Sequence, residues 1–222
     1  FALILRGVSF EFRNKVDSPA WKKVWDTCIF VGSFLPALLF GVAFANIFKG
    51  IPIDQDGIYL GNLFTLLNPY GLLGGVLFLC LFLVHGALWL TVRADGDLAQ
   101  RAEDLAGKLW PVLTGVAVVF LVASYIFTPL YNNYLANPVL FLVPAISVAA
   151  IVGIKYFLMQ KAFFKAWLAS AATIASCTFF GVIGLFPNLF PSSIDAAYSL
   201  SAYNASSSPL TLKIMLGVAL VM

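Results

Sequence analysis

One polar segment of the sequence carries the residue types that move protons or hold charged partners at a membrane surface. Arg6 directly follows one apolar run and Asp26 directly precedes another, and Glu11 and Trp25 lie between them. A charge at the edge of an apolar run has to be paired, hydrated or protonated. These four residues are therefore a candidate proton path or subunit interface. Ordinary anchoring by aromatic and basic side chains is the alternative.

Asp26 is expected to avoid lipid by contacting a basic group, a helix N-terminus or water. Arg6 lies at the same membrane face and is a plausible partner, as are Lys22 and Lys23. Because Asp26 stands just before an apolar span, it could also serve as the N-cap of that helix. Two roles stay open, a structural cap and a relay that carries protons from the cytoplasm.

His85 is the single histidine of the sequence. Haem iron often takes an axial histidine, so His85 is a candidate cofactor ligand. The sequence offers no second histidine, and a hydrogen bond from His85 to a neighbouring helix is the favoured interpretation. Phosphate-binding glycine loops, dinucleotide fingerprints, zinc-protease motifs and nucleophile elbows do not occur. The sequence therefore assigns no catalytic residue and no metal ligand.

The composition places these residues in a protein whose solvent is a lipid bilayer. Of the 222 residues, 61% are hydrophobic and 10% are charged, whereas soluble domains have about 45–50% and about 25%. This balance excludes a soluble domain, a disordered chain and a nucleic-acid-binding protein. The cysteines lie far apart in apolar runs, so we expect them to pack as small hydrophobic residues: Cys28, Cys80 and Cys177.

Long uncharged runs predict the membrane-spanning helices, because a helix needs about 20 apolar residues to cross a bilayer. The sequence predicts an all-α, polytopic integral membrane protein with helix bundles in a single transmembrane domain, residues 1–222. We expect five complete spans and, at each end, a helix that is cut, so that the chain is partial. The spans are Thr27–Phe48, Pro69–Val92, two runs between Lys108 and Lys155 that break at Thr128–Pro138, and Ala166–Phe190, followed by the partial run Leu210–Met222.

Charge and small residues predict the orientation and packing of these spans. Alternate connections carry eleven basic residues on one side and two on the other, which places the basic side in the cytoplasm. The basic connection Arg93–Lys108 is expected to be a helical extension. Small residues let membrane helices approach closely. We therefore expect the stripe Ala169, Thr173, Cys177 and Gly181 to face protein, and Phe157, Phe163 and Phe164 to face lipid or the interface.

Several motifs, in the same order along the whole chain, resemble subunit II of the cytochrome bd-type quinol oxidases. The runs that carry the resemblance are Leu5–Arg13, Trp25–Pro36, Gly41–Asn46, Leu67–Leu72, Phe186–Ser193 and Ser207–Leu212. Arg6, Glu11, Trp25 and Asp26 lie on matching motif positions. The resemblance implies a fold of two four-helix bundles with one peripheral helix.

The resemblance further implies a non-haem subunit of a heterodimeric enzyme in the bacterial inner membrane. The complex would oxidise quinol, either ubiquinol or menaquinol, and reduce dioxygen to water. Two b-type haems and one d-type haem would belong to subunit I. Subunit II would support subunit I and contribute to quinone, oxygen or proton access. A small single-span accessory subunit and membrane lipid are further expected partners. A small secondary transporter and a structural membrane anchor are the alternatives.

Overall fold

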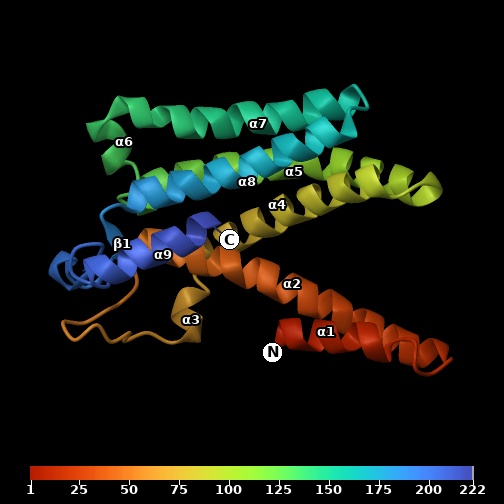
Figure 1. Cartoon of the computed structure of the whole chain (residues 1–222), viewed down its shortest axis with the longest axis horizontal. Coiled ribbons are helices and arrows are strands. Elements are labelled where there is room, and N and C mark those ends of the chain that lie inside the picture. Colours follow the sequence, from red (N-terminus) through yellow and green to blue (C-terminus); the bar gives the residue numbers. More distant parts are fainter. Residues whose placement is uncertain (222) are drawn as a thin grey trace.

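The computed structural model describes residues 1–221 and consists mainly of long helices (Figure 1). The short elements lie in the connections between those helices. In chain order the elements are α1 Ala2–Phe12, α2 Pro19–Lys49, α3 Leu63–Leu66, α4 Pro69–Arg93, α5 Gly96–Phe127, α6 Asn132–Ala136, η1 Pro138–Phe141, α7 Leu142–Met159, α8 Phe163–Leu185, β1 Asn188–Phe190, η2 Ala196–Tyr198, β2 Leu200–Ser201 and α9 Pro209–Val221.

Five helices of the described chain are long and apolar enough to cross a membrane. They are α2, α4, α5, α8 and the continuous segment Pro138–Met159 that joins η1 to α7. This confirms the five predicted complete spans and the all-α, polytopic membrane fold. The predicted break at Thr128–Pro138 is also confirmed, because α5 ends at Phe127 and the short α6 fills the turn.

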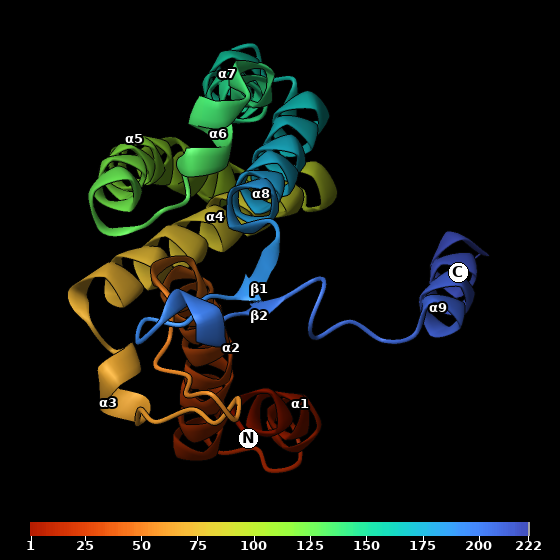
Figure 2. The ribbon, with the colours of Figure 1, turned by 90° about the vertical axis from the view of Figure 1, so that its left-hand side faces the viewer.

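Helices α4, α5, α7 and α8 form a four-helix bundle. Helix α4 packs against α5 and α8, and α7 packs against α8 and α5. Helices α1 and α2 form a separate hairpin that joins the bundle through the contact of α2 with α4. Figure 2 shows α9 standing apart from the bundle, and none of its described residues is buried.

The connections divide between the two ends of the bundle. Those between α1 and α2, α4 and α5, and α7 and α8 lie together at one end, which we name the basic end, on the right in Figure 1. The first turns of α5 form the predicted helical extension of residues 93–108, and they bury Ala102 and Ala106. The opposite end carries the long loops before α3 and after α8, which meet in a parallel bridge between Ile51 and Ser192.

Glycines bring α2 and α4 into backbone contact near the opposite end. A Cβ atom added to Gly41 would collide with the backbone oxygen of Gly74, and one added to Gly75 would lie 2.9 Å from the oxygen of Leu38. Membrane helices that lack a hydrophobic drive between them associate through such close approach. The crossing of α2 and α4 therefore depends on glycines on both helices.

The small-residue stripe on α8 faces this chain's own core. Thr173 and Gly181 are buried, and the ring of Phe48 covers Gly181. The prediction for the phenylalanines holds only for Phe164, which is 55% exposed. Phe157 and Phe163 pack partly buried against the core, because α7 and α8 lie close together along their length. The prediction that these two rings face outward is therefore wrong.

Three predicted helix limits are wrong. Helix α1 continues past Arg6 to Phe12, α2 begins at Pro19 instead of after Asp26, and α8 ends at Leu185. A charged side chain does not interrupt the backbone hydrogen bonds of a helix, so the helix runs on beyond the apolar segment. Proline both starts and stops helices: Pro19 suits a first helical turn, and Pro187 cannot continue α8.

A polar network ties the loop before α4 to α2 at the opposite end. Asn46 of α2 is 4% exposed. Its Nδ2 donates to the carbonyl oxygens of Val42 and Leu66, both at 2.7 Å, and its Oδ1 accepts from Asn68 Nδ2 at 2.7 Å. Asn68 in turn caps α4 by accepting from the amide of Gly71 at 3.0 Å. One buried amide therefore fixes both the loop and the start of the next helix.

Candidate functional site

The α1–α2 hairpin holds a bidentate ion pair at the basic end. Arg13 Nε donates to one carboxylate oxygen of Asp26 at 2.5 Å, and Arg13 Nη2 donates to the other at 3.1 Å. Two parallel hydrogen bonds to one carboxylate fix its orientation. The side chains remain 38% and 51% exposed, so both charges are accessible from outside this chain.

Asp26 contacts a basic group as predicted, but the predicted partners are wrong. Arg6 makes no ion pair among the described residues, and Lys22 pairs with Asp17 at 2.8 Å. Because α1 extends beyond Arg6, the turn brings Arg13 beside Asp26. The N-cap prediction is also wrong, because Ser18 occupies the N-cap position of α2. The hydrogen bond that Arg13 donates to Asp26 raises the pKa of Arg13, so the guanidinium stays charged.

Three aromatic rings form the inner side of the same hairpin. Trp25 stacks on Phe12 and meets Trp21 edge-on, each with 5.6 Å between ring centroids. Trp21 Nε1 donates to the carbonyl oxygen of Phe12 at 2.8 Å, which ties α2 to the end of α1. Trp25 therefore packs the hairpin together directly beside the Arg13–Asp26 pair.

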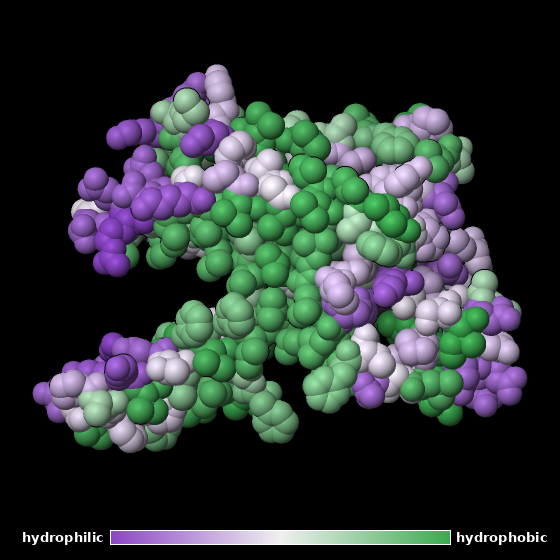
Figure 3. Space-filling model, turned by 180° about the vertical axis from the view of Figure 1, so that it is seen from behind, coloured by the Kyte–Doolittle hydropathy of each residue, from purple (hydrophilic) through white to green (hydrophobic). Residues whose placement is uncertain are grey.

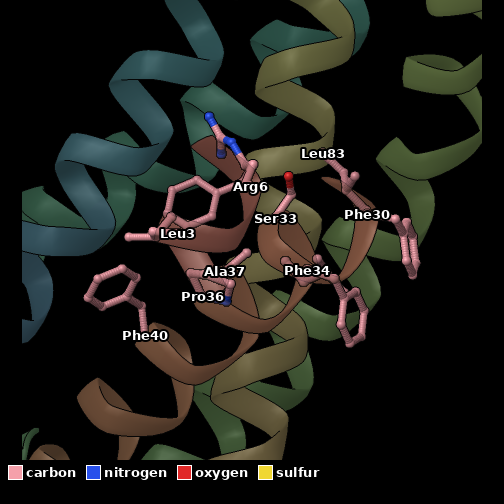
Figure 4. A pocket seen from close by; sticks show the side chains of 11 residues that line it. Leu3, Arg6, Phe30, Ser33, Phe34, Pro36, Ala37, Phe40 and Leu83 are labelled. Atoms are coloured by element: carbon pink, nitrogen blue, oxygen red, sulfur yellow. The ribbon is translucent and has the colours of Figure 1, made fainter. Parts of the chain in front are cut away.

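Arg6 lies apart from Asp26, in an apolar cavity of about 580 Å³ between α1, α2 and α4. Ser33 is the other polar residue of its lining, and the remaining lining residues are apolar, as Figure 4 shows in part. In Figure 3 the hairpin and the bundle diverge toward the basic end and leave a notch with apolar walls. Glu11 is exposed and forms no ion pair within residues 1–221. The structure thus brings Trp25 and Asp26 together and leaves Arg6 and Glu11 outside that contact.

The favoured interpretation of His85 is confirmed. Its Nδ1 lies 2.7 Å from the hydroxyl of Ser170 on α8, and its ring packs against Trp167 with 5.4 Å between centroids. Sequence reasoning missed both contacts, since they join residues far apart in the chain. The spacing of His85, Trp89 and Arg93, every four residues along α4, was the available signal for a shared helix face.

The described residues do not fit a haem with two protein ligands. His85 has one ring nitrogen engaged by Ser170. No group of three or more His, Cys, Asp or Glu within residues 1–221 could hold a metal ion. The cavity that Arg6 lines has no histidine in its lining.

Known proteins resemble this chain over its whole length. The model of the family described as cytochrome bd terminal oxidase subunit II matches residues 1–222. The probable cytochrome oxidase subunit 2 of Haemophilus influenzae is 34% identical over 99% of this chain and 66% of its own length. Cytochrome bd-I ubiquinol oxidase subunit 2 of Escherichia coli is 33% identical over 100% of the chain and 66% of its own.

A third relative and one solved structure resemble the chain in the same way. Cytochrome bd ubiquinol oxidase subunit 2 of Bacillus subtilis is 35% identical over 100% of this chain and 65% of its own. A bd oxidase structure from Geobacillus thermodenitrificans aligns with a TM-score of 0.75 at 15% identity, over 97% of this chain and 64% of that one, which supports the fold. The chain spans about two thirds of the length of the relatives it matches. By the match over its full length, the chain belongs to the cytochrome bd terminal oxidase subunit II family.

Proposed function

We propose that this chain is a membrane subunit of a terminal oxidase that couples quinol oxidation to the reduction of dioxygen to water. The observation that carries the proposal is the family match over all 222 residues. The Escherichia coli and Bacillus subtilis relatives are ubiquinol oxidase subunits by name. The enzyme would be a quinol:oxygen oxidoreductase, and this chain would be a non-haem part of it.

The cofactors would then lie on a partner. We propose that subunit I carries two b-type haems and one d-type haem, and that the substrate is ubiquinol or menaquinol. The single histidine of this chain and its contact with Ser170 support the placement of the haems on subunit I. A small single-span accessory subunit and membrane lipid complete the proposed set of partners.

We also propose an orientation for this integral membrane protein in the bacterial inner membrane. The basic end would face the cytoplasm, because eleven basic residues lie in the connections of that side against two on the other. Residues 1–222 would act as one transmembrane domain, since the α2–α4 crossing joins the hairpin to the bundle.

The haem spectrum of the purified complex tests this function. We expect reduced-haem bands to co-purify with the chain, and we expect His85→Ala to leave every band in the assembled complex. The reason is that Ser170 engages His85 and no second histidine exists. A colourless complex would refute the oxidase proposal. Loss of one band with assembly intact would instead show that His85 binds a haem.

Asp26 is the residue we propose to assist proton entry from the cytoplasm. It combines a partly exposed carboxylate with a position at the basic end of a span. Asp26→Asn keeps the size of the side chain and one of the two oxygens that accept from Arg13, but it cannot carry a proton. We expect normal haem content and slower quinol-dependent oxygen uptake in the assembled complex.

Asp17→Asn is the matched control, because Asp17 is another ion-paired carboxylate on the same hairpin and its side chain is 98% exposed. It should leave oxygen uptake unchanged. Equal uptake in wild type and Asp26→Asn would reduce Asp26 to a structural role in the hairpin. Equal slowing in both variants would indicate a general effect of surface charge.

A further inference from the structure

Arg6 carries a charge at a level of the α1–α2 hairpin where the neighbouring residues carry none. Helix α1 packs closely on α2 there, because a Cβ atom added to Gly32 would lie 2.8 Å from the Cβ of Arg6. Gly32 is six residues after Asp26 and seventeen before Lys49, which places it about 9 Å from the first and about 25 Å from the second along α2. The backbone of Arg6 therefore lies at the depth of the uncharged run Thr27–Phe48.

No anion within residues 1–221 balances this charge. The ion pairs of the described chain join other residues, and the lining of the cavity beside Arg6 contains no Asp or Glu. Ser33 is the other polar lining residue, and its hydroxyl donates to the carbonyl oxygen of Ile29 at 2.7 Å. A charge at this depth in a membrane is costly unless it is paired. The arginine therefore indicates an anionic partner from outside the described residues.

The cavity offers that partner an apolar surface between two parts of the chain. Leu3 of α1, Phe30 and Phe40 of α2 and Phe82 of α4 line it, and all four side chains are exposed. Figure 4 shows Arg6 among the side chains of this lining. In Figure 3 the notch between the hairpin and the bundle has apolar walls. The surface thus fits an apolar element that carries one negative charge.

Depth and charge distinguish the groups that a membrane offers to this arginine. Lipid phosphates lie in the headgroup region, outside the hydrocarbon core, and Arg13, Lys15 and Lys23 of the same hairpin are nearer to that region. A quinone or a water molecule can accept a hydrogen bond but carries no charge. A carboxylate on a membrane helix can lie at the depth of Arg6, and it can accept two parallel hydrogen bonds from the guanidinium.

We propose that a further transmembrane helix packs into this cavity and pairs an Asp or Glu carboxylate with Arg6. The helix belongs to this same subunit and lies outside residues 1–222. The chain spans 66% of the Escherichia coli relative over 253 aligned residues, so the remaining third of that relative is longer than the about 20 residues that one span needs. The cavity lies between α1, α2 and α4 of one chain, which favours an occupant from that same chain.

Infrared difference spectra of the assembled complex, with the full-length subunit, test the chemistry of the partner. Arg6→Met removes the cation. A carboxyl group that is shielded from water then binds a proton, because burial disfavours its charged form. We expect a C=O stretching band of a protonated carboxyl group that wild type lacks. Arg6→Lys keeps the positive charge and should show no such band.

Arg101→Met is the matched control, since it makes the same chemical change at an exposed ion pair. Arg101 Nη1 lies 4.0 Å from a carboxylate oxygen of Asp97, and both side chains are largely exposed. Water therefore remains around the Asp97 carboxylate, and no new band should appear. An assembled Arg6→Met complex without the band would overturn the proposal, because a phosphate or a neutral group would then be the partner. A band of equal strength in Arg101→Met would overturn it as well.

Photo-crosslinking identifies the source of the helix and leaves Arg6 in place, so it does not require that Arg6→Met assembles. Phe30 lines the cavity and is exposed, so it is replaced with the photoreactive residue p-benzoylphenylalanine. We expect irradiation of the purified complex to capture a peptide of this subunit from outside residues 1–222, with an Asp or Glu inside an apolar run. The same replacement at Phe164, an exposed ring of α8 outside that cavity, should not capture this peptide.

The captured molecule decides the outcome. Capture of subunit I, of lipid alone, or of the same peptide from both positions would overturn the proposal. Neither measurement uses haem bands or oxygen uptake. A colourless complex would therefore refute the oxidase proposal and leave both tests valid, whereas capture of lipid alone would refute the packed helix and leave the haem spectrum unchanged.

Discussion

Replacing Gly41 with alanine is expected to separate the α1–α2 hairpin from the bundle and to cost the assembled protein more stability than any conservative surface change. The added methyl group would collide with the backbone oxygen of Gly74, and the backbone of a packed helix cannot rotate away as a side chain can. Overpacking typically costs about 1–3 kcal/mol. The close approach of Gly74 and Gly75 to α2 leaves little space for relaxation. The measurement is the temperature at which the detergent-solubilised complex loses its monodisperse state.

The same chemical change at Gly86 is the matched control. Gly86 lies inside α4, as Gly41 lies inside α2, but its added Cβ would meet nothing within 4 Å. Alanine has the higher helix propensity, so Gly86→Ala should be neutral or slightly stabilising. If the Gly41→Ala and Gly86→Ala complexes have the same melting temperature, α2 and α4 are not held together by this backbone contact.

Replacing Asn46 with alanine is expected to loosen the loop before α4. The change removes the buried partner of the Leu66 carbonyl and of the Asn68 side-chain amide, which keeps only its bond to the carbonyl oxygen of Thr65. Each buried polar group left unpaired costs about 1–3 kcal/mol. We therefore expect a lower melting temperature of the complex and faster proteolysis of the loop formed by residues 50–68.

Asn132→Ala controls for the loss of an amide side chain. Asn132 lies exposed in α6, and its side chain has no hydrogen-bond partner among the described residues. It should leave both the melting temperature and the proteolysis of the 50–68 loop unchanged. Proteolysis that is equally slow in wild type and Asn46→Ala would mean that other contacts hold the loop, such as the bridge between Ile51 and Ser192.

The sequence by itself determined the membrane class, the number of complete spans and the turn at Thr128–Pro138. These features follow from the length of uncharged apolar runs and from local proline and asparagine signals. Hydropathy is a sum over neighbouring residues, so no knowledge of helix packing is needed. Hydropathy predicts the ends of helices less well. Arg6 and Asp26 mark the limits of apolar segments, but the helices α1 and α2 continue past these two residues.

The tertiary structure alone decided which polar side chains meet. Asp26 pairs with Arg13 instead of Arg6 because of the length of α1 and the geometry of the turn that follows it. His85 reaches Ser170 because α4 and α8 lie side by side with a particular rotation about their axes. A shift of one residue turns a helical side chain by about 100°. A helix that is apolar all round has nearly the same hydropathy on every face, so its sequence does not show how it is rotated about its axis. Only the packed helices reveal these partners.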